Sequence, residues 1–452
     1  MLNVAVVAFE ALAVTTVAPR VARDLGGTDL YGWTFAAFML ANLVGVVIVG
    51  HAADRHGPAL PFIVGLSIFT TGMVVCGLAP SMPVFIAGRA VQGLGAGAMV
   101  VTAYVTIGQA FEERERPHQF ALLSTAWIVP GLVSPALAGL ITDAVGWRFV
   151  FLALIAMPIV ATSISLPVMR TLRPSSSQPT TALPIGPAVA LAIAAGLIIT
   201  GLGSKSALVL GPCVAIGLLV GLPAFRTLTP PGTARARHGL PAIVATRWLE
   251  TFAFFGANAF LAFSLTRVRD LSSVTVGAVL TPATLLWACG AWLQARLTGR
   301  WARRTMVTVG VATVGIATGG AALVLVRGVP TAVVAVIWAT AGLGMGLSYP
   351  TTALAALSEA PAGRQGEATA SLQLSDVLGQ ALGTGIGGAL LALAAANGVA
   401  RRDALAVVFG MLVLSAVLGI RTARNFPDDP DSLKGDARLR EGQGDKSAPQ
   451  LP

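Results

Sequence analysis

Residues 83–108 read PVFIAGRAVQGLGAGAMVVTAYVTIG, and this stretch decides the fold class of the chain. Throughout the run the only charged side chain is Arg89. An α-helix rises about 1.5 Å per residue, so about 20 apolar residues cross the roughly 30 Å hydrocarbon core of a bilayer. The run is therefore predicted to be a transmembrane helix rather than a helix in the core of a water-soluble protein.

Similar apolar runs recur along the chain and explain its composition. Of its 452 residues, 55% are hydrophobic and 11% are charged, and the mean hydropathy is +0.78. A soluble domain carries about 25% charged residues. The charges gather in short clusters between fourteen apolar runs, and the alternating segments of about ten residues that a membrane β-barrel requires are not found. The sequence predicts an all-α integral membrane protein with 14 transmembrane helices.

The distribution of basic residues predicts how the chain is oriented. Its formal net charge is +10. With the N-terminus in the cytoplasm, 19 Lys and Arg residues fall on the cytoplasmic side and 9 on the outer side, which satisfies the positive-inside rule. We therefore expect a multi-pass protein of the plasma or inner membrane with both termini in the cytoplasm. The basic charge is attributed to orientation and not to nucleic-acid binding.

Two echoes within the sequence indicate an internal duplication. GLGAG at 93–97 recurs as GLGMG at 342–346, and the loop GHAADRHGP at 50–58 has a counterpart in ARLTGRWARR at 295–304. These echoes align the first six predicted helices with the last six and leave two helices between them. The predicted parts are an N-terminal six-helix bundle (1–170), a linker with two inserted transmembrane helices (171–240), a C-terminal six-helix bundle (241–422) and a disordered cytoplasmic tail (423–452).

A few ionisable residues inside the predicted spans are candidates for chemistry, because a charge at the bilayer centre costs about 2.5–3.5 kcal/mol. Glu10 lies near the middle of the first span, where burial disfavours the charged form and favours proton binding; a permanent pair with an arginine is the alternative. Asp376 has Gln373 and Gln380 at helical spacing, which predicts a polar stripe on one face. A second titrating or cation-recognising group is expected there, with a satisfied polar cluster as the alternative.

Other residues within the spans lead to further expectations. Arg247 and Glu250 lie three residues apart on one helix face, so a local ion pair is expected. Phe38 and Trp127 are candidates to line a substrate cavity together with the two glutamines, although packing or lipid contact is the alternative. The histidines and cysteines show no metal-ligand spacing, and no phosphate-binding loop occurs. We therefore predict no metal, no cofactor and no enzymatic activity.

Four signatures in the N-terminal 150 residues carry a resemblance to a known family. They are Glu10, Pro19, Val21, Asp24, Leu25 and Gly26 in and after the first span; Gly50, Ala53, Asp54, Arg55 and Gly57 after the second; Arg89, Gln92, Gly93 and Gly95 in the fourth; and Pro130, Gly131, Ser134, Pro135, Ala138 and Gly139 in the fifth. In this order and on these spans they resemble the major facilitator superfamily, and specifically its fourteen-span drug:proton antiporter branch.

The resemblance implies a major facilitator fold, in which two six-helix bundles rock about a central site. It implies roles for three sets of residues: proton coupling by Glu10 and Arg89; a gating loop of Gly50, Asp54, Arg55 and Gly57; and a motif typical of exporters with Pro130, Gly131, Pro135 and Gly139. From its position within a span, Asp376 is expected to take part in proton coupling as well.

The implied activity is proton-coupled export of small apolar or cationic drug-like compounds by alternating access. The expected partners are a small-molecule substrate, protons and the lipid bilayer, and we expect a monomer. A facilitator or importer of a small metabolite is the first alternative, and a non-transporting membrane sensor is the second.

Overall fold

The computed structural model describes residues 2–26, 30–172, 183–204, 206–361 and 363–427. Within these ranges the chain forms helices and no strand, apart from one isolated bridge between Thr298 and Trp301. Residues 173–182, near the start of the predicted linker, and residues 428–452, most of the predicted tail, lie outside the described residues, so the disorder of the tail stays a prediction. The helices are α1 (Leu2–Asp24), α2 (Trp33–His56), α3 (Ala59–Gly77), α4 (Met82–Ala110), α5 (Arg116–Thr125), α6 (Ile128–Val145), α7 (Trp147–Leu154), α8 (Ala156–Thr171), α9 (Ile185–Gly203), α10 (Ala207–Leu228), η2 (Thr233–Arg235), α11 (Leu240–Arg267), α12 (Ser273–Leu297), α13 (Arg303–Ala321), η3 (Ala322–Leu325), α14 (Thr331–Glu359), α15 (Gln365–Ala396) and α16 (Arg401–Ala423).

In the described residues, fourteen helical segments are long and apolar enough to cross a membrane. Two of these segments are interrupted: α5 with α6 forms one, and α7 with α8 forms another. The break between α5 and α6 falls just before Pro130, whose ring conflicts with the carbonyl of Ala126 and which lacks an N–H group. The prediction of an all-α membrane protein with 14 spans is confirmed.

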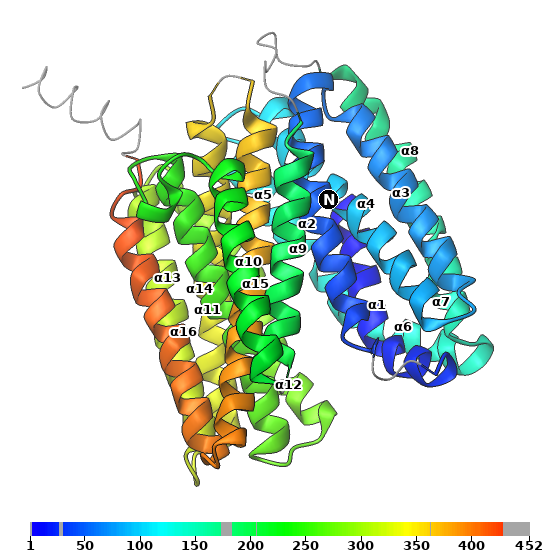
Figure 1. The fold of residues 1–452 in the computed structure, drawn as a ribbon. Helices are drawn as coiled ribbons and strands as arrows, with labels where there is room; N and C mark the ends of the chain where they lie inside the picture. The colour runs from blue at the N-terminus through cyan, green and yellow to red at the C-terminus, as the bar shows by residue number, and fades with distance from the viewer. Residues whose placement is uncertain (1, 27–29, 173–182, 205, 362, 428–452) are drawn as a thin grey trace, which may run out of the picture.

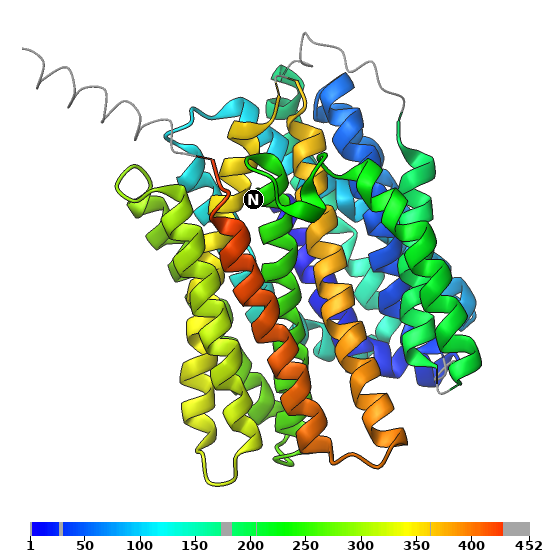
Figure 2. The same ribbon diagram turned by 60° about the vertical axis from the view of Figure 1, so that its left-hand side comes forward.

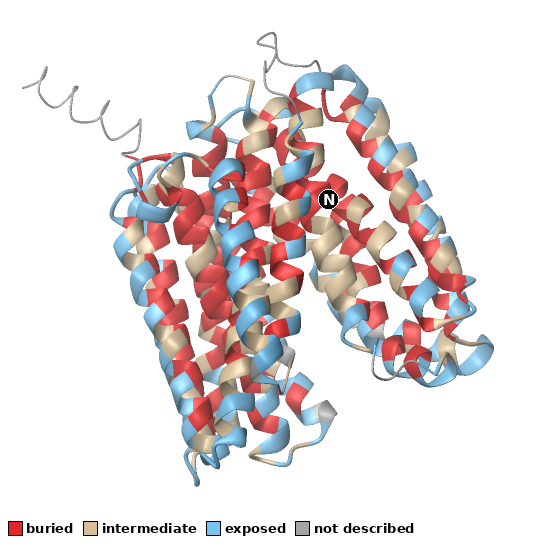
Figure 3. Ribbon diagram, viewed as in Figure 1, coloured by how far each residue is buried: buried red, intermediate tan, exposed pale blue. Residues whose placement is uncertain are grey.

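The helices stand in two groups side by side, with the inserted pair at the seam (Figures 1 and 2). In chain order one group holds α1–α8 and the other holds α11–α16, and α5 of the first group packs mainly against α12 and α14 of the second. Helix α9 packs against α2 of the first group, α15 of the second group and α10, whereas α10 packs mainly against α9. The outer faces of the groups carry exposed side chains (Figure 3), and many of these are large and apolar, among them Leu140, Ile164, Leu219 and Ile316. Such a surface fits lipid and not water.

Small side chains line the face of α9 that meets the two groups. Ala188, Ala192 and Ala195 are buried in one apolar cluster with Leu43 of α2 and Leu378 of α15. A largely apolar cavity of about 240 Å³ also lies between these three helices. The inserted pair is thus attached to both groups through apolar contacts.

The two glycine motifs pack in the same way in the two groups. In α4, Gly93 lies against α2 at the Phe38 carbonyl, and Gly95 lies against α3. In α14, Gly342 lies against α12 and Gly344 lies against α13. A Cβ atom at any of these glycines would collide with the backbone of the neighbouring helix, which is why the close approach needs glycine. The order α2–α4–α3 is therefore repeated as α12–α14–α13.

The two groups meet most closely at one end of the molecule. There Gly50 of α2 lies directly against Gly366 of α15, and Arg303 pairs with Glu113 at 2.8 Å. Towards the opposite end, where α1 leads into α2, the two groups diverge (Figure 1). We call the end with these contacts the closed end.

Candidate functional site

The first candidate site is a buried ion pair between α1 and α4. Glu10 is 1% exposed, and its Oε1 accepts hydrogen bonds from Arg89 Nη1 and from Gln92 Nε2, the latter at 3.2 Å. Arg89 also donates to Gln92 Oε1 at 3.0 Å and to the Thr34 carbonyl at 3.2 Å. Its guanidinium carbon lies 4.4 Å from the centre of the Phe38 ring. The helical spacing of Arg89 and Gln92 places both on the face of α4 that meets α1.

One oxygen of this ion pair is left without a partner. Glu10 Oε2 is buried and makes no hydrogen bond. A buried pair in apolar surroundings is stable only when its remaining polar atoms are bonded, and an unsatisfied buried group costs about 1–3 kcal/mol. The site therefore has one oxygen that the arginine satisfies and a second that is able to take up a proton.

The exporter-like motif lies on α6, directly beside this site. Ser134 Oγ donates a hydrogen bond to the carbonyl of Phe9 at 2.6 Å, so α6 is fixed to α1 one residue from Glu10. Pro130 is buried where α6 begins, and Pro135 lies in the same helix. The two remaining motif residues meet open space where a Cβ atom would be added: Gly131 and Gly139.

Asp54, from the predicted gating loop, joins the two groups at the closed end. Its Oδ1 accepts a hydrogen bond from the Gly366 N–H at 2.6 Å, and its Oδ2 accepts one from the Glu367 N–H at 2.9 Å. Both N–H groups belong to the first turn of α15, where unpaired amides and the helix dipole favour a negative charge. Three other residues of this loop were predicted to matter. Gly50 packs on α15, and Arg55 is exposed. Gly57 follows α2 and has a φ of 75°.

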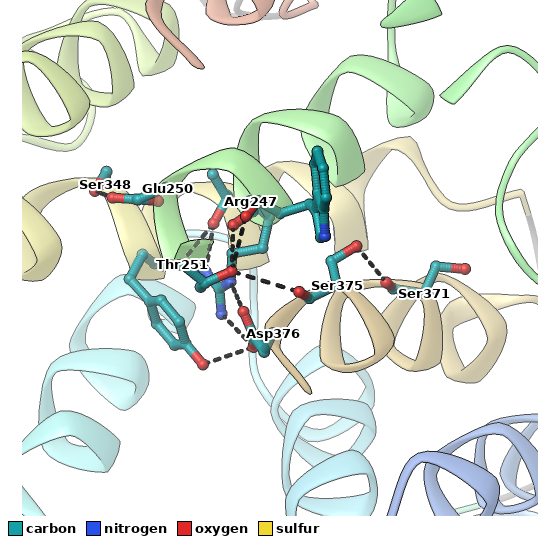
Figure 4. Close-up of polar contacts among 10 residues, drawn as sticks. Arg247, Glu250, Thr251, Ser348, Ser371, Ser375 and Asp376 are labelled. Carbon is teal, nitrogen blue, oxygen red and sulfur yellow. Dashed lines mark hydrogen bonds and ion pairs between the residues drawn. The ribbon is translucent and has the colours of Figure 1, made fainter. Parts of the chain in front are cut away.

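A second buried ion pair lies between α11 and α15 (Figure 4). Arg247 donates from Nε to Asp376 Oδ1 at 2.7 Å and from Nη2 to Oδ2 at 3.3 Å. Tyr349 of α14 donates its hydroxyl to Asp376 Oδ2 at 2.7 Å. Arg247 Nη1 donates to the Tyr349 carbonyl and to Thr352 Oγ1, both at 2.6 Å. The Asp376 carboxylate is thus bound by three donors from two helices.

The local ion pair expected between Arg247 and Glu250 is wrong. Arg247 pairs instead with Asp376, and Glu250 contacts Ser348 of α14 (Figure 4). Spacing along one helix shows which side chains are neighbours, but another helix can offer an arginine a better partner. Here α15 offers a carboxylate in bidentate geometry, which is a stronger arrangement than a single contact along the helix.

The polar stripe predicted on α15 is only partly assembled. Gln373 is buried with an unpartnered Nε2, and Gln380 is half-buried. The hydrogen bonds of Asp376 come from other helices and not from either glutamine. Trp127 is 42% exposed next to the start of α6. Of the four predicted cavity residues, only Phe38 contacts one of the two buried ion pairs.

Reasoning from the sequence missed the partners that α14 supplies. Residues 348–352 read SYPTT and interrupt an otherwise apolar span. From this segment, Ser348, Tyr349 and Thr352 all reach the second ion pair or Glu250. A run of hydroxyl side chains in the middle of a span is the signal that identifies this helix as part of the site.

The described residues restrict the chemistry of the sites. A polar cavity of about 380 Å³ lies at the closed end, beside Asp54, Gln109 and Gln365. Within the described ranges, no three His, Cys, Asp or Glu side chains come together in a way that could hold a metal ion. The arrangement of the two ion pairs is suited to binding protons and recognising charge.

Comparison with known proteins agrees with this arrangement. A profile of the Major Facilitator Superfamily matches residues 1–384. Multidrug resistance protein 3 of Bacillus subtilis (strain 168) is 31% identical over 164 residues, which cover 36% of this chain and 32% of that protein. Multidrug resistance protein Stp of Mycobacterium tuberculosis (strain CDC 1551 / Oshkosh) is 33% identical over 144 residues, or 31% of this chain and 27% of that protein. The matched segments thus span about a third of the length of these relatives.

A solved structure extends the likeness to nearly the whole chain. The human organic anion transporter MFSD10 (TETRAN) superposes with a TM-score of 0.69 at 14% sequence identity, over 92% of this chain and 97% of that chain. At this identity the superposition shows the fold alone. The profile match, the fourteen spans and the repeated helix packing point the same way. The chain belongs to the Major Facilitator Superfamily, whose members are membrane transporters and not enzymes.

Proposed function

We propose that this protein is a proton-coupled exporter of small apolar or cationic drug-like compounds that works by alternating access. Its two moving bodies are residues 1–170 and 241–422, and residues 171–240 connect them. It acts as a monomer in the cell membrane with both termini in the cytoplasm. The exporter-like motif on α6 and the multidrug-resistance names of two relatives support export over import.

The observation that carries the proposal is the environment of Glu10. A transporter that exchanges a substrate for a proton needs a group that is protonated in one state and ionised in another. Glu10 is buried near the middle of α1, one of its oxygens is bound to Arg89, and the other has no partner. Proton uptake at Oε2 would weaken the attraction of Arg89 for this carboxyl, which links protonation to the packing of α1 on α4.

The position of the closed end supports a conformation that opens outward. The contacts of Asp54 and Gly50 with α15 lie at the end of α2 whose following loop the basic-residue distribution assigns to the cytoplasm. With this orientation the diverging end faces outward, as is required when protons from outside replace a released substrate.

One proton per substrate molecule, carried by a single titrating carboxyl, would provide enough free energy for export. Exchange of one proton for a monovalent cation moves no net charge and is driven by the pH gradient alone, whereas exchange for an uncharged substrate moves one charge, which is worth about 2.3 kcal/mol per 100 mV. At roughly 150 mV this is about 3.4 kcal/mol, which corresponds to a substrate gradient on the order of 300-fold.

The test measures transport in proteoliposomes with an imposed pH gradient, with ethidium as the fluorescent probe and an uncoupler as the reference condition. The wild-type protein is expected to move ethidium against its gradient, and Glu10→Gln is expected to lose this movement while folding normally. Glu359→Gln is the matched control, because Glu359 is exposed at the end of α14. Gradient-driven transport by Glu10→Gln at the wild-type rate would remove Glu10 from the coupling. Movement of ethidium in the same direction as the protons would indicate an importer.

A further inference from the structure

Glu250 is a buried acid outside both ion pairs. Its side chain is 0% exposed in the middle of the second group of helices. Its Oε1 contacts Ser348 Oγ of α14, and its Oε2 makes no hydrogen bond. Within the described residues it forms no ion pair, since its helical neighbour Arg247 is bound to Asp376. An ionised carboxylate at such a position would pay the full cost of burying an uncompensated charge.

The hydrogen bonds of Ser348 indicate which form of Glu250 is present. Ser348 Oγ lies 2.8 Å from the carbonyl of Gly344 and also contacts Glu250 Oε1. A serine has one hydroxyl hydrogen and a backbone carbonyl can only accept. Both contacts are hydrogen bonds at the same time when Ser348 donates to Gly344 and Glu250 donates to Ser348. This arrangement suits a protonated Glu250, the neutral form that burial without a cationic partner favours.

The groups packed around Glu250 offer no other compensation. On its own helix, Arg247 is occupied by Asp376 of α15 and by the Tyr349 carbonyl and Thr352 of α14. The Tyr349 hydroxyl is also bound to Asp376. From the other two helices packed nearby, Gly310 of α13 lies against Ser348, and Ser415 of α16 donates a hydrogen bond to the carbonyl of Leu249; neither residue carries a charge.

We propose that Glu250 is a second proton-binding site, which is loaded while Arg247 is paired with Asp376 and emptied when Arg247 turns to Glu250. The two residues are three apart on one face of α11, so the guanidinium can reach either carboxylate. Binding of a cationic substrate or a proton at Asp376 releases Arg247. The arginine then pairs with Glu250, whose O–H bond breaks, and the proton leaves to water. This inference rests on the proposed antiport, since it adds a proton to the same cycle.

The internal duplication supports the proposal independently. Glu10 extends from α1 towards α4, and Glu250 extends from α11 towards α14. The repeated glycine motifs make α14 the counterpart of α4, and the duplication aligns α11 with α1. Each group therefore has a buried glutamate between equivalent helices, α1 and α4 in one group and α11 and α14 in the other. Each glutamate leaves its Oε2 without a partner.

The experiment measures protonation directly and does not depend on transport. Infrared difference spectra of the purified protein in lipid at neutral pH, without substrate or gradient, report the C=O stretch of protonated carboxyl groups. Isotopic labelling of glutamate separates its bands from those of aspartate. We expect one protonated-glutamate band to disappear in Glu250→Gln and to persist in the exposed control Glu359→Gln. In Asp376→Asn, which frees Arg247, the same band is expected to disappear although Glu250 is unchanged.

Two outcomes would overturn the proposal. A Glu250→Gln spectrum with all the wild-type glutamate bands would show that Glu250 is ionised. A band of full intensity in Asp376→Asn would show that Arg247 does not change partner. Should Glu250→Gln fail to fold, Ser348→Ala provides the same information, because the loss of the acceptor must shift the Glu250 band and an unshifted spectrum counts against the assignment. Absence of gradient-driven ethidium transport by the wild-type protein, with the glutamate bands changing as expected in Glu250→Gln and Asp376→Asn, would sink the proposed antiport alone, so the two failures are distinguishable.

Discussion

The carboxylate of Asp54 is bound to the first turn of α15 through the Gly366 N–H, at 2.6 Å from its Oδ1. Asp54 and Gly366 are 312 residues apart and belong to the two different groups of helices. A second bond, from the Glu367 N–H, completes the contact. This contact ties the two groups together at the closed end, and its strength depends on the negative charge of Asp54.

Replacing that charge should open the closed end. In Asp54→Asn the side chain keeps one acceptor oxygen but loses the charge that the helix N-terminus favours. A hydrogen bond to a charged group contributes about 1.5–3 kcal/mol, so we expect the ratio of open to closed forms at this end to rise about tenfold or more. Spin labels on α2 and α15 would measure the distance distribution. Glu359→Gln, which removes an exposed charge at the end of α14, is the control, and an unchanged distribution in Asp54→Asn would contradict the role of the contact.

Filling the space between α2 and α15 should have a similar effect by a different route. A Cβ atom at Gly366 would collide with the Gly50 carbonyl, and overpacking of this kind costs about 1–3 kcal/mol. We expect Gly366→Ala to disfavour the closed end, seen as increased labelling of cysteines introduced behind it. Gly410→Ala in α16 should leave labelling unchanged, because a Cβ atom there meets nothing within 4 Å. Equal labelling of the two variants would show that α2 and α15 have room for a methyl group between Gly50 and Gly366.

The ion pair of Glu10 and Arg89 should respond as a unit. Arg89→Ala leaves a buried carboxylate without its cation, and breaking a buried pair in this way costs about 3–5 kcal/mol. We expect a lower thermal unfolding temperature at neutral pH, with substantial recovery in the double variant Glu10→Gln/Arg89→Ala, which carries no buried charge at the site. Thermal unfolding of the three proteins in the same detergent gives the comparison. A double variant as unstable as Arg89→Ala would contradict the interpretation.

Asp376 should affect substrate selection. We expect Asp376→Asn to lose transport of cationic substrates while it keeps neutral ones, because the variant lacks the carboxylate that attracts a cation. Tyr349→Phe removes only the hydroxyl bond to Asp376 Oδ2 and keeps the charge, so its effect on cations should be much smaller. Parallel transport assays with one cationic and one neutral dye test this. Equal retention of both dyes by Asp376→Asn would exclude a recognition role.

The fold could be predicted in detail because its cause is composition along the chain. A helix must bond its own backbone in lipid, so each long apolar run, such as residues 83–108, becomes a span whatever its neighbours are. The repeat of GLGAG as GLGMG likewise predicted how the first six helices align with the last six, and the close packing of both motifs agrees with that alignment.

The partners of the buried charges could be predicted only in part. Glu10 and Arg89 were both candidates, but nothing in the sequence measures the distance between α1 and α4. The partner of Arg247 was predicted wrongly because Glu250 is near in sequence, whereas Asp376 lies 129 residues away. Pairing across helices depends on how each helix is rotated about its axis, and apolar spans with weak periodicity do not specify that rotation.

The alanine-rich face of α9 has a mechanical consequence. Ala188, Ala192 and Ala195 lie in one apolar cluster with residues of α2 and α15, and Gly196 of α9 leaves room for the Leu40 side chain of α2. An alanine offers a neighbouring helix only one methyl group with which to interdigitate. We therefore expect α2 and α15 to change their mutual tilt beneath this part of α9 with few side chains to unlock, and the inserted pair to keep that flank covered during the proposed cycle.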